Sequence, residues 1–149
     1  MDYCWTVWGN ASCTHIDKLY KLQKRAARII LNASTETPSA VMFKKLEWLN
    51  IYNRITKIGA VMMYKWMNGL TPEFFKKCSF VNNYTLRSTS LDNLHVQRPN
   101  TNFEKPTFQY SGIIFCNSLP LTLKECKNLE LFKRHCSIYL LNKQETELL

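Results

Sequence analysis

The chain has 149 residues, of which 46% are hydrophobic and 21% charged, proportions that exclude a disordered segment and favour a globular domain. Its 20 Lys and Arg against 11 Asp and Glu give a formal net charge of +9, which predicts attraction to nucleic acid or another anionic surface. No apolar run approaches the ~20 residues that a membrane span requires, so we expect no membrane partner.

The cysteine pattern favours an intracellular protein. Six cysteines lie at positions 4, 13, 78, 116, 126 and 136, and no two of them form a C-x-x-C pair. The opening residues, MDYCWTVWGN, are interrupted by polar residues, unlike the apolar core of a signal peptide. We therefore expect reduced, mostly buried thiols in a nuclear or cytoplasmic protein.

The first third of the chain predicts a short extended segment and then a helix. Alternating aromatic residues over 3–8 weakly indicate a strand, or the end of an element that began upstream. A helix is expected from Thr14 to about Asn32, with Thr14 and Asp17 spaced as a capping box. At about 100° per residue its apolar side chains fill one continuous arc: Ile16, Leu19, Tyr20, Leu22, Ala26, Ala27, Ile29, Ile30 and Leu31.

Five cations occupy the remaining sector of this helix, about 120° wide, with Asp17 as the accompanying acid. They are Lys18, Lys21, Lys24, Arg25 and Arg28. An ordinary solvated face is one interpretation, because every surface helix needs a polar side. However, such faces usually mix Glu with Lys to avoid like-charge repulsion, so a stripe that binds an anion is the other interpretation.

Further helices are expected downstream. Thr37 as N-cap and Pro38 as the first helical residue predict a helix through SAVMFKKLEWL that packs Val41, Met42, Leu46 and Leu49. A helix over 52–68 is indicated by apolar spacing and ends at Asn68-Gly69; its apolar series is Ile51, Ile55, Ile58, Met62 and Trp66. A brief helix is predicted over 72–78.

The last part of the chain predicts less regular structure and then one more helix. Residues 79–106 are expected to be mostly irregular, with a strand at NYTLR, and residues 107–120 to form a strand and a turn. Asn128 should cap a final helix over 129–141, and the end from Gln144 to Leu149 should fray. The expected fold is therefore mainly α, with a long irregular connection and a minor extended or β element. Its parts are a helical region 1–78, an irregular or extended region 79–120 and a C-terminal helical region 121–149.

Nothing in the composition indicates catalysis. Two-metal chemistry needs neighbouring carboxylates, yet Asp2, Asp17 and Asp92 lie far apart and no Gly-rich phosphate loop occurs. The histidines at 15, 95 and 135 and the nearby cysteines match no zinc-binding spacing. We expect no catalytic residue, no metal and no cofactor.

Several strings in order carry a family resemblance: YCWTVWGN, LYKLQKRAARIIL, MFKKLEWLNIYNRI, MYKWMNGLTPEFF, YTLRS, TFQYSGIIFCNSLP and LELFKRHCSIYLL. Together they resemble the C-terminal region of polyproteins from non-LTR retrotransposons of the jockey and LINE-like groups, over nearly the entire chain. In that family the region follows the polymerase core. The resemblance therefore implies a helical, nucleic-acid-associated fragment of a reverse transcriptase, with that core as a partner. The polymerase palm with its Asp pair and the endonuclease are both missing. Cys116 stands where the family usually has Trp.

This resemblance implies a non-catalytic extension that holds RNA or an RNA–DNA duplex through backbone phosphates. The expected contacts are Lys18, Lys21, Lys24, Arg25, Arg28 and, in the polar segment YTLRS, Arg87. Among the tryptophans, Trp48 and Trp66 favour core packing over base stacking, and Trp5 and Trp8 leave both interpretations open. Two alternatives remain: a structural extension that docks on the polymerase thumb, with an apolar patch near 3–8, and a truncated remnant without function.

Overall fold

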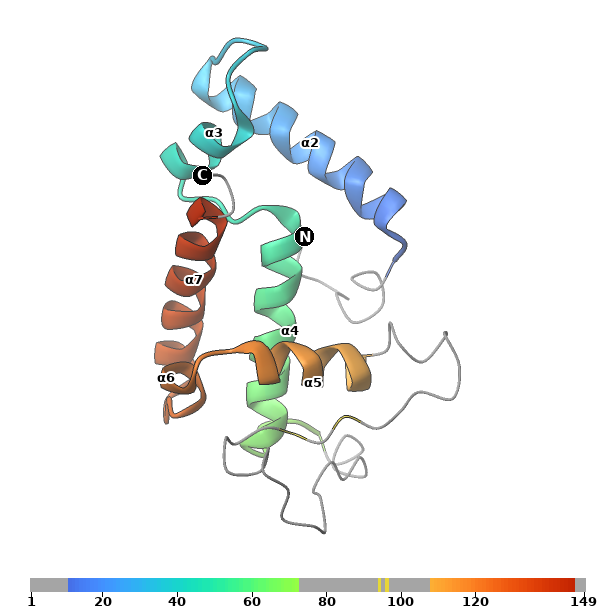
Figure 1. The fold of residues 1–149 in the computed structure, drawn as a ribbon, viewed down its shortest axis with the longest axis vertical. Coiled ribbons are helices and arrows are strands. Elements are labelled where there is room, and N and C mark those ends of the chain that lie inside the picture. The colour runs from blue at the N-terminus through green and yellow to red at the C-terminus, as the bar shows by residue number, and fades with distance from the viewer. Residues whose placement is uncertain (1–10, 73–93, 95, 97–107, 147–149) are drawn as a thin grey trace. The chain divides into compact units, whose positions relative to one another are not determined.

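The computed structural model describes residues 11–72, 94, 96 and 108–146, and within these ranges the chain is mainly helical (Figure 1). Six helices occur there, and no strand does. They are α2 (Cys13–Leu31), α3 (Ser39–Lys45), α4 (Ile51–Met67), α5 (Phe108–Ser118), α6 (Leu121–Lys124) and α7 (Leu129–Thr146). The expected helix over 72–78 and the expected strands near 3–8 and at NYTLR lie outside the described residues.

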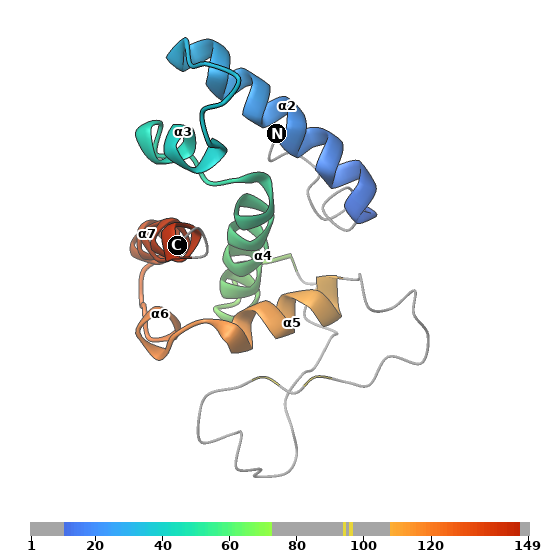
Figure 2. The ribbon, with the colours of Figure 1, turned by 45° about the horizontal axis from the view of Figure 1, so that its top comes forward.

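The chain divides into two units, Met1–Lys57 with His135–Leu149, and Ile58–Arg134. In the first unit α3 packs beside the C-terminal half of α2 (Figure 2). Their shared core consists of Ala27, Met42 and Phe43, which are at most 2% exposed. The Tyr20 ring lies 6.0 Å from that of Phe43 and extends the core along α2. The expectation that Val41 packs in this core was wrong, because its side chain is 53% exposed.

Left-handed residues end both of these helices. Asn32 (φ 46°) follows α2, and the next N–H, of Ala33, donates to the Arg28 carbonyl at 3.0 Å. Glu47 (φ 52°) follows α3 in the same way, with the Trp48 N–H donating to the Phe43 carbonyl at 2.9 Å. Asn tolerates the left-handed conformation well, whereas for Glu this conformation is energetically unfavourable. The sequence signal at Asn32 therefore predicted one helix end, and the end at Glu47 had no signal.

The Gln144 side chain joins α7 to the start of α4 within the first unit. Its Oε1 accepts from the backbone N–H of Asn50 at 2.9 Å, and its Nε2 donates to the Trp48 carbonyl at 3.2 Å. The side chain is only 6% exposed. Figure 1 shows the end of α7 beside the first turn of α4. The expectation that the chain frays from Gln144 was therefore wrong for residues 144–146, which belong to α7; residues 147–149 lie outside the described residues.

In the second unit, α4 packs with α5 and with the start of α7. Met63, Ile113 and Cys116 form a buried cluster at 6% exposure or less. The rings of Tyr64 and Phe132 stack with centroids 4.5 Å apart, and the Tyr64 hydroxyl donates to the Cys126 carbonyl at 2.8 Å.

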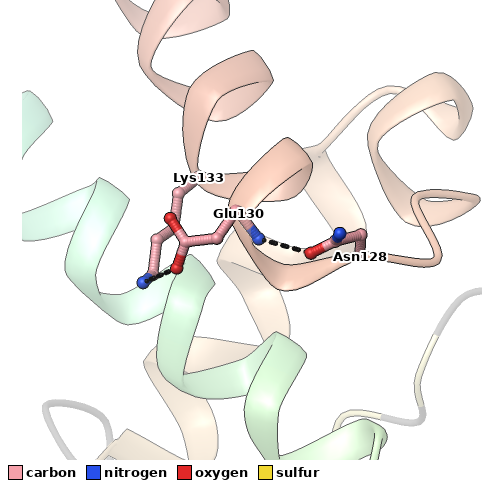
Figure 3. A network of polar contacts seen from close by, with 3 residues as sticks. All are labelled: Asn128, Glu130 and Lys133. Atoms are coloured by element: carbon pink, nitrogen blue, oxygen red, sulfur yellow. Dashed lines mark hydrogen bonds and ion pairs between the residues drawn. The ribbon is translucent and has the colours of Figure 1, made fainter.

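The start of α7 carries the expected cap. Figure 3 shows Asn128 Oδ1 accepting from the Glu130 N–H at 2.9 Å, which confirms Asn128 as the residue that caps this helix. In the same turn the Lys133 ammonium pairs with Glu130 at 2.6 Å. Lys133 is thus engaged in an ion pair on the surface of α7.

The segment 107–120 was predicted as a strand and a turn, and this prediction was wrong. Residues Phe108–Ser118 form α5, in which Ile113 and Cys116, one turn apart, enter the same core. Asn117 follows on this face, where its side chain accepts from the Leu94 N–H at 2.8 Å and donates to the Leu94 carbonyl at 2.9 Å. Aromatic and β-branched composition favours strands only weakly, so packing at helical spacing overrode it.

Candidate nucleic-acid interface

The helix α2 presents one face to the core of the first unit. Ile16 and Ala27 are 4% and 0% exposed, and Tyr20 lies between them, half-buried. Gln23 shares this face and donates from Nε2 to the Leu49 carbonyl at 2.8 Å. The buried side of α2 therefore covers only part of the apolar arc.

Three of the five predicted cations point into solvent. Lys18, Lys21 and Arg25 are exposed and follow one another at helical spacings of three and four residues. Within the described part of the chain, no ion pair engages any of them. These three side chains, which we call the basic face, are free to meet an anion.

The other two predicted cations, Lys24 and Arg28, lie closer to the protein. Both are half-buried, and the Lys24 ammonium sits 4.4 Å from the centre of the Tyr20 ring, within the range of a cation–π interaction. The Nε of Arg28 is buried without a hydrogen-bond partner, while its place in the last turn of α2 suits the negative end of the helix dipole. Lys24 and Arg28 thus border the basic face rather than form its centre.

Asp17, the acid that accompanies these cations, is engaged by α4. Its carboxylate accepts a hydrogen bond from the Tyr52 hydroxyl, which raises the pKa of Tyr52 to about 12 because the bond favours the protonated phenol. The predicted capping box was wrong. Ser12 is the N-cap, one residue before the start of α2 at Cys13, and Asp17 is not in the first turn.

A third face of α2 is apolar and exposed. Leu22, Ile29 and Ile30 are 58%, 73% and 58% exposed, and Ala26 lies exposed among them. The apolar arc of α2 therefore does not lie wholly in the core. The sequence did hold a signal for this face. The arc is about 200° wide, whereas a helix on one core needs a stripe of roughly 100°.

The remaining predicted site residues divide between core and undescribed segments. Arg87, Trp5 and Trp8 lie outside the described residues. Trp48 packs half-buried against the cluster of Ala27, Met42 and Phe43, and Trp66 packs against the cluster of the second unit. Each of these two rings thus takes part in the core packing of its own unit.

The described cysteines are free thiols in different surroundings. Cys13 is exposed and Cys126 half-buried, whereas Cys116 and Cys136 are buried. Burial raises the pKa of the Cys116 thiol and raises that of Cys136 to about 11. In the described ranges, no three His, Cys, Asp or Glu residues are grouped so that they could hold a metal ion. No helix there combines the length and hydropathy of a membrane span.

Comparison with known proteins adds no assignment to this geometry. No family model matches the chain, and neither a curated protein nor a solved structure shows significant similarity to it.

Proposed function

We propose that the chain is a non-catalytic, basic module that holds RNA or an RNA–DNA duplex through backbone phosphates. The observation that carries this proposal is the basic face. Lys18, Lys21 and Arg25 are exposed on one side of α2, while the neighbouring acid, Asp17, is hydrogen-bonded to Tyr52.

The geometry suits a run of phosphates better than a single small anion. Lys18 and Arg25 are seven positions apart, which corresponds to about 10 Å along a helix axis. Their flexible side chains reach out from a rigid backbone and neutralise phosphates by releasing counterions. Contacts of this kind position a nucleic acid without selecting its sequence, so binding should be sequence-independent and sensitive to salt.

The sequence resemblance supplies the biological setting of the proposal. In the family that the sequence resembles, this region follows the core of a reverse transcriptase, whose RNA template and RNA–DNA duplex would supply the phosphates. On this basis the partners are an RNA or DNA backbone and the reverse transcriptase core. Arg87 joins the proposed phosphate contacts on sequence grounds alone.

The experiment that tests the proposal measures fluorescence anisotropy of labelled single-stranded RNA, RNA–DNA hybrid and duplex DNA with the full chain. A variant with Lys18→Gln, Lys21→Gln and Arg25→Gln removes the basic face and lowers the net charge from +9 to +6. Its matched control, Lys45→Gln, Lys127→Gln and Arg134→Gln, removes the same charges from other exposed positions. We expect micromolar binding of RNA or hybrid that only the first variant loses. Equal losses of RNA affinity in both variants would show that binding depends on net charge alone, which would contradict the proposal.

A further inference from the structure

The exposed apolar side chains of α2 form a continuous strip that the core leaves uncovered. Leu22, Ala26, Ile29 and Ile30 lie three to four positions apart or adjacent, and the three large members are 58–73% exposed. Along the axis they cover about 12 Å, or roughly two helical turns. Single exposed apolar residues are ordinary, but a contiguous strip of this kind marks an interaction surface.

The strip has a charged border on one side and protein on the other. On the helical projection, Lys18 and Arg25 lie about 20–60° from Ile29 and Leu22. On the opposite border, Gln23 is hydrogen-bonded to the Leu49 carbonyl and Ile16 is buried, so this side of the strip faces the first unit. A ligand lying on the strip therefore meets cations along one edge only.

This asymmetry determines the chemistry of the occupant. We infer that the strip docks an amphipathic helix of another protein, with an apolar seam and Asp or Glu along one flank. The seam covers Leu22, Ile29 and Ile30, and the acidic flank meets Lys18 and Arg25. Helices commonly dock in this manner, with apolar anchors at every third or fourth position and charges that set their orientation.

Charge disfavours a second copy of this chain as the occupant. In an antiparallel pair about a twofold axis the edges that carry Lys18 and Arg25 would face each other, and in any pair each chain carries +9. An acidic helix instead gains attraction along the same edge. The inference shares Lys18 and Arg25 with the proposed function but does not rest on it, because the strip is exposed whether or not these cations bind a nucleic acid.

The test uses the full chain and a labelled helical peptide of about 20 residues, with Leu at every third or fourth position and Glu along one flank. A second peptide carries Lys in place of Glu. The protein variant is Leu22→Gln with Ile29→Gln. Its matched control is Leu131→Gln with Ile138→Gln, which alters the same residue types at the same spacing on α7, at 49% and 47% exposure.

We expect the acidic peptide to bind the wild type and the control. The Leu22→Gln, Ile29→Gln variant should bind it more than about tenfold more weakly, since two central anchors are lost. The Lys peptide should bind the wild type at least about tenfold more weakly than the Glu peptide does. RNA affinity of the variant should stay unchanged, which separates this inference from the proposed function.

Four results would overturn the inference. One is the absence of binding by the acidic peptide, and another is equal loss in the control. A third is self-association of the wild type that the Leu22→Gln, Ile29→Gln variant abolishes in sedimentation, because a second copy would then cover the strip. The fourth is a lower unfolding midpoint for this variant than for the control, because the strip would then be covered by the chain itself.

Discussion

The carboxylate of Asp17 accepts a hydrogen bond from the Tyr52 hydroxyl, which fixes the acid of α2 against the first turn of α4. In a free helix Asp17 would stand one turn from Lys21 and partly offset its charge. In this structure the carboxylate is instead hydrogen-bonded to Tyr52, and no ion pair joins it to Lys21 within the described residues. The contact orients this carboxylate toward α4 and leaves its charge unchanged.

This contact predicts a delayed ionisation of Tyr52. Its pKa is raised from 10.0 to about 12, first by the hydrogen bond to Asp17 and then by burial. Because the folded state holds the proton more tightly, the contact contributes fully below pH 10 and is lost as the pH rises toward about 12. An ultraviolet titration of the wild type minus that of Tyr52→Phe should show one transition near pH 12.

The control for this titration is Asp17→Asn, which keeps the size of the side chain and removes its charge. In that background the Tyr52 transition should move back toward pH 10, its ordinary value. A Tyr52 transition at the same pH with and without the carboxylate would contradict the assignment of the shift to Asp17.

Gln144 should stabilise the first unit through its two backbone contacts. Gln144→Ala leaves the half-buried N–H of Asn50 and the carbonyl of Trp48 without this partner, so we expect a loss of about 1–3 kcal/mol in unfolding free energy. Denaturant unfolding followed by circular dichroism measures it. Asn142→Ala, at an exposed position of α7, is the control and should be neutral or slightly stabilising. Equal midpoints for the two variants would contradict the anchoring role.

Glu47 should be a site where glycine stabilises the protein. Its backbone has φ 52°, a left-handed conformation that costs a residue with a Cβ atom roughly 1–2 kcal/mol. We expect Glu47→Gly to raise the unfolding free energy by about 0.5–1 kcal/mol, because the flexible unfolded chain offsets part of the gain. Glu47→Ala removes the same charge and keeps the strain. A gain as large for alanine as for glycine would assign the effect to charge instead.

Thiol reactivity should separate the described cysteines by burial. Cys13 is exposed, whereas Cys136 is 0% exposed and its pKa is raised to about 11. Because the thiolate is the reactive form, alkylation of the native protein near pH 8 should modify Cys13 and leave Cys116 and Cys136 protected until denaturant is added. Peptide mass mapping over time measures this order. Labelling of Cys136 as fast as Cys13 would contradict its placement in the core.

Local signals in the sequence predicted the main helices well. Asn32, Gly69 and Asn128 mark helix ends in a way that depends on backbone chemistry, and the structure uses all three positions. The helical spacing of apolar residues likewise predicted α2, α4 and the greater part of α7. These features are set within a few residues, so one sequence suffices to find them.

Features that depend on distant residues were not predictable in this way. Segment 108–118 has strand-like composition and became α5 because Ile113 and Cys116 pack with Met63. Gln144 is buried because Asn50 and Trp48, far away in the chain, present backbone groups to it. The division of α2 into core, basic and apolar faces depends on where α3 and α4 pack. The helical pattern was enough to place the five cations in one sector of α2, but it did not show which of them are exposed.

The basic face makes a quantitative prediction about salt. For single-stranded RNA, each phosphate contact adds about 0.7 to the slope of log Kobs against log salt concentration. Removing three contacts through Lys18→Gln, Lys21→Gln and Arg25→Gln should therefore lower the magnitude of the slope by about 2. The matched control at Lys45, Lys127 and Arg134 should keep nearly the wild-type slope.

The measurement to make first is this slope, for wild type, variant and control, with a single RNA over several salt concentrations and with folding checked by circular dichroism. A slope reduced by about 2 in the variant alone is the predicted result, and it would identify Lys18, Lys21 and Arg25 as phosphate contacts. The same slope in all three proteins, or no binding near physiological salt, would contradict the proposed function and leave these cations as the solvated side of a core helix.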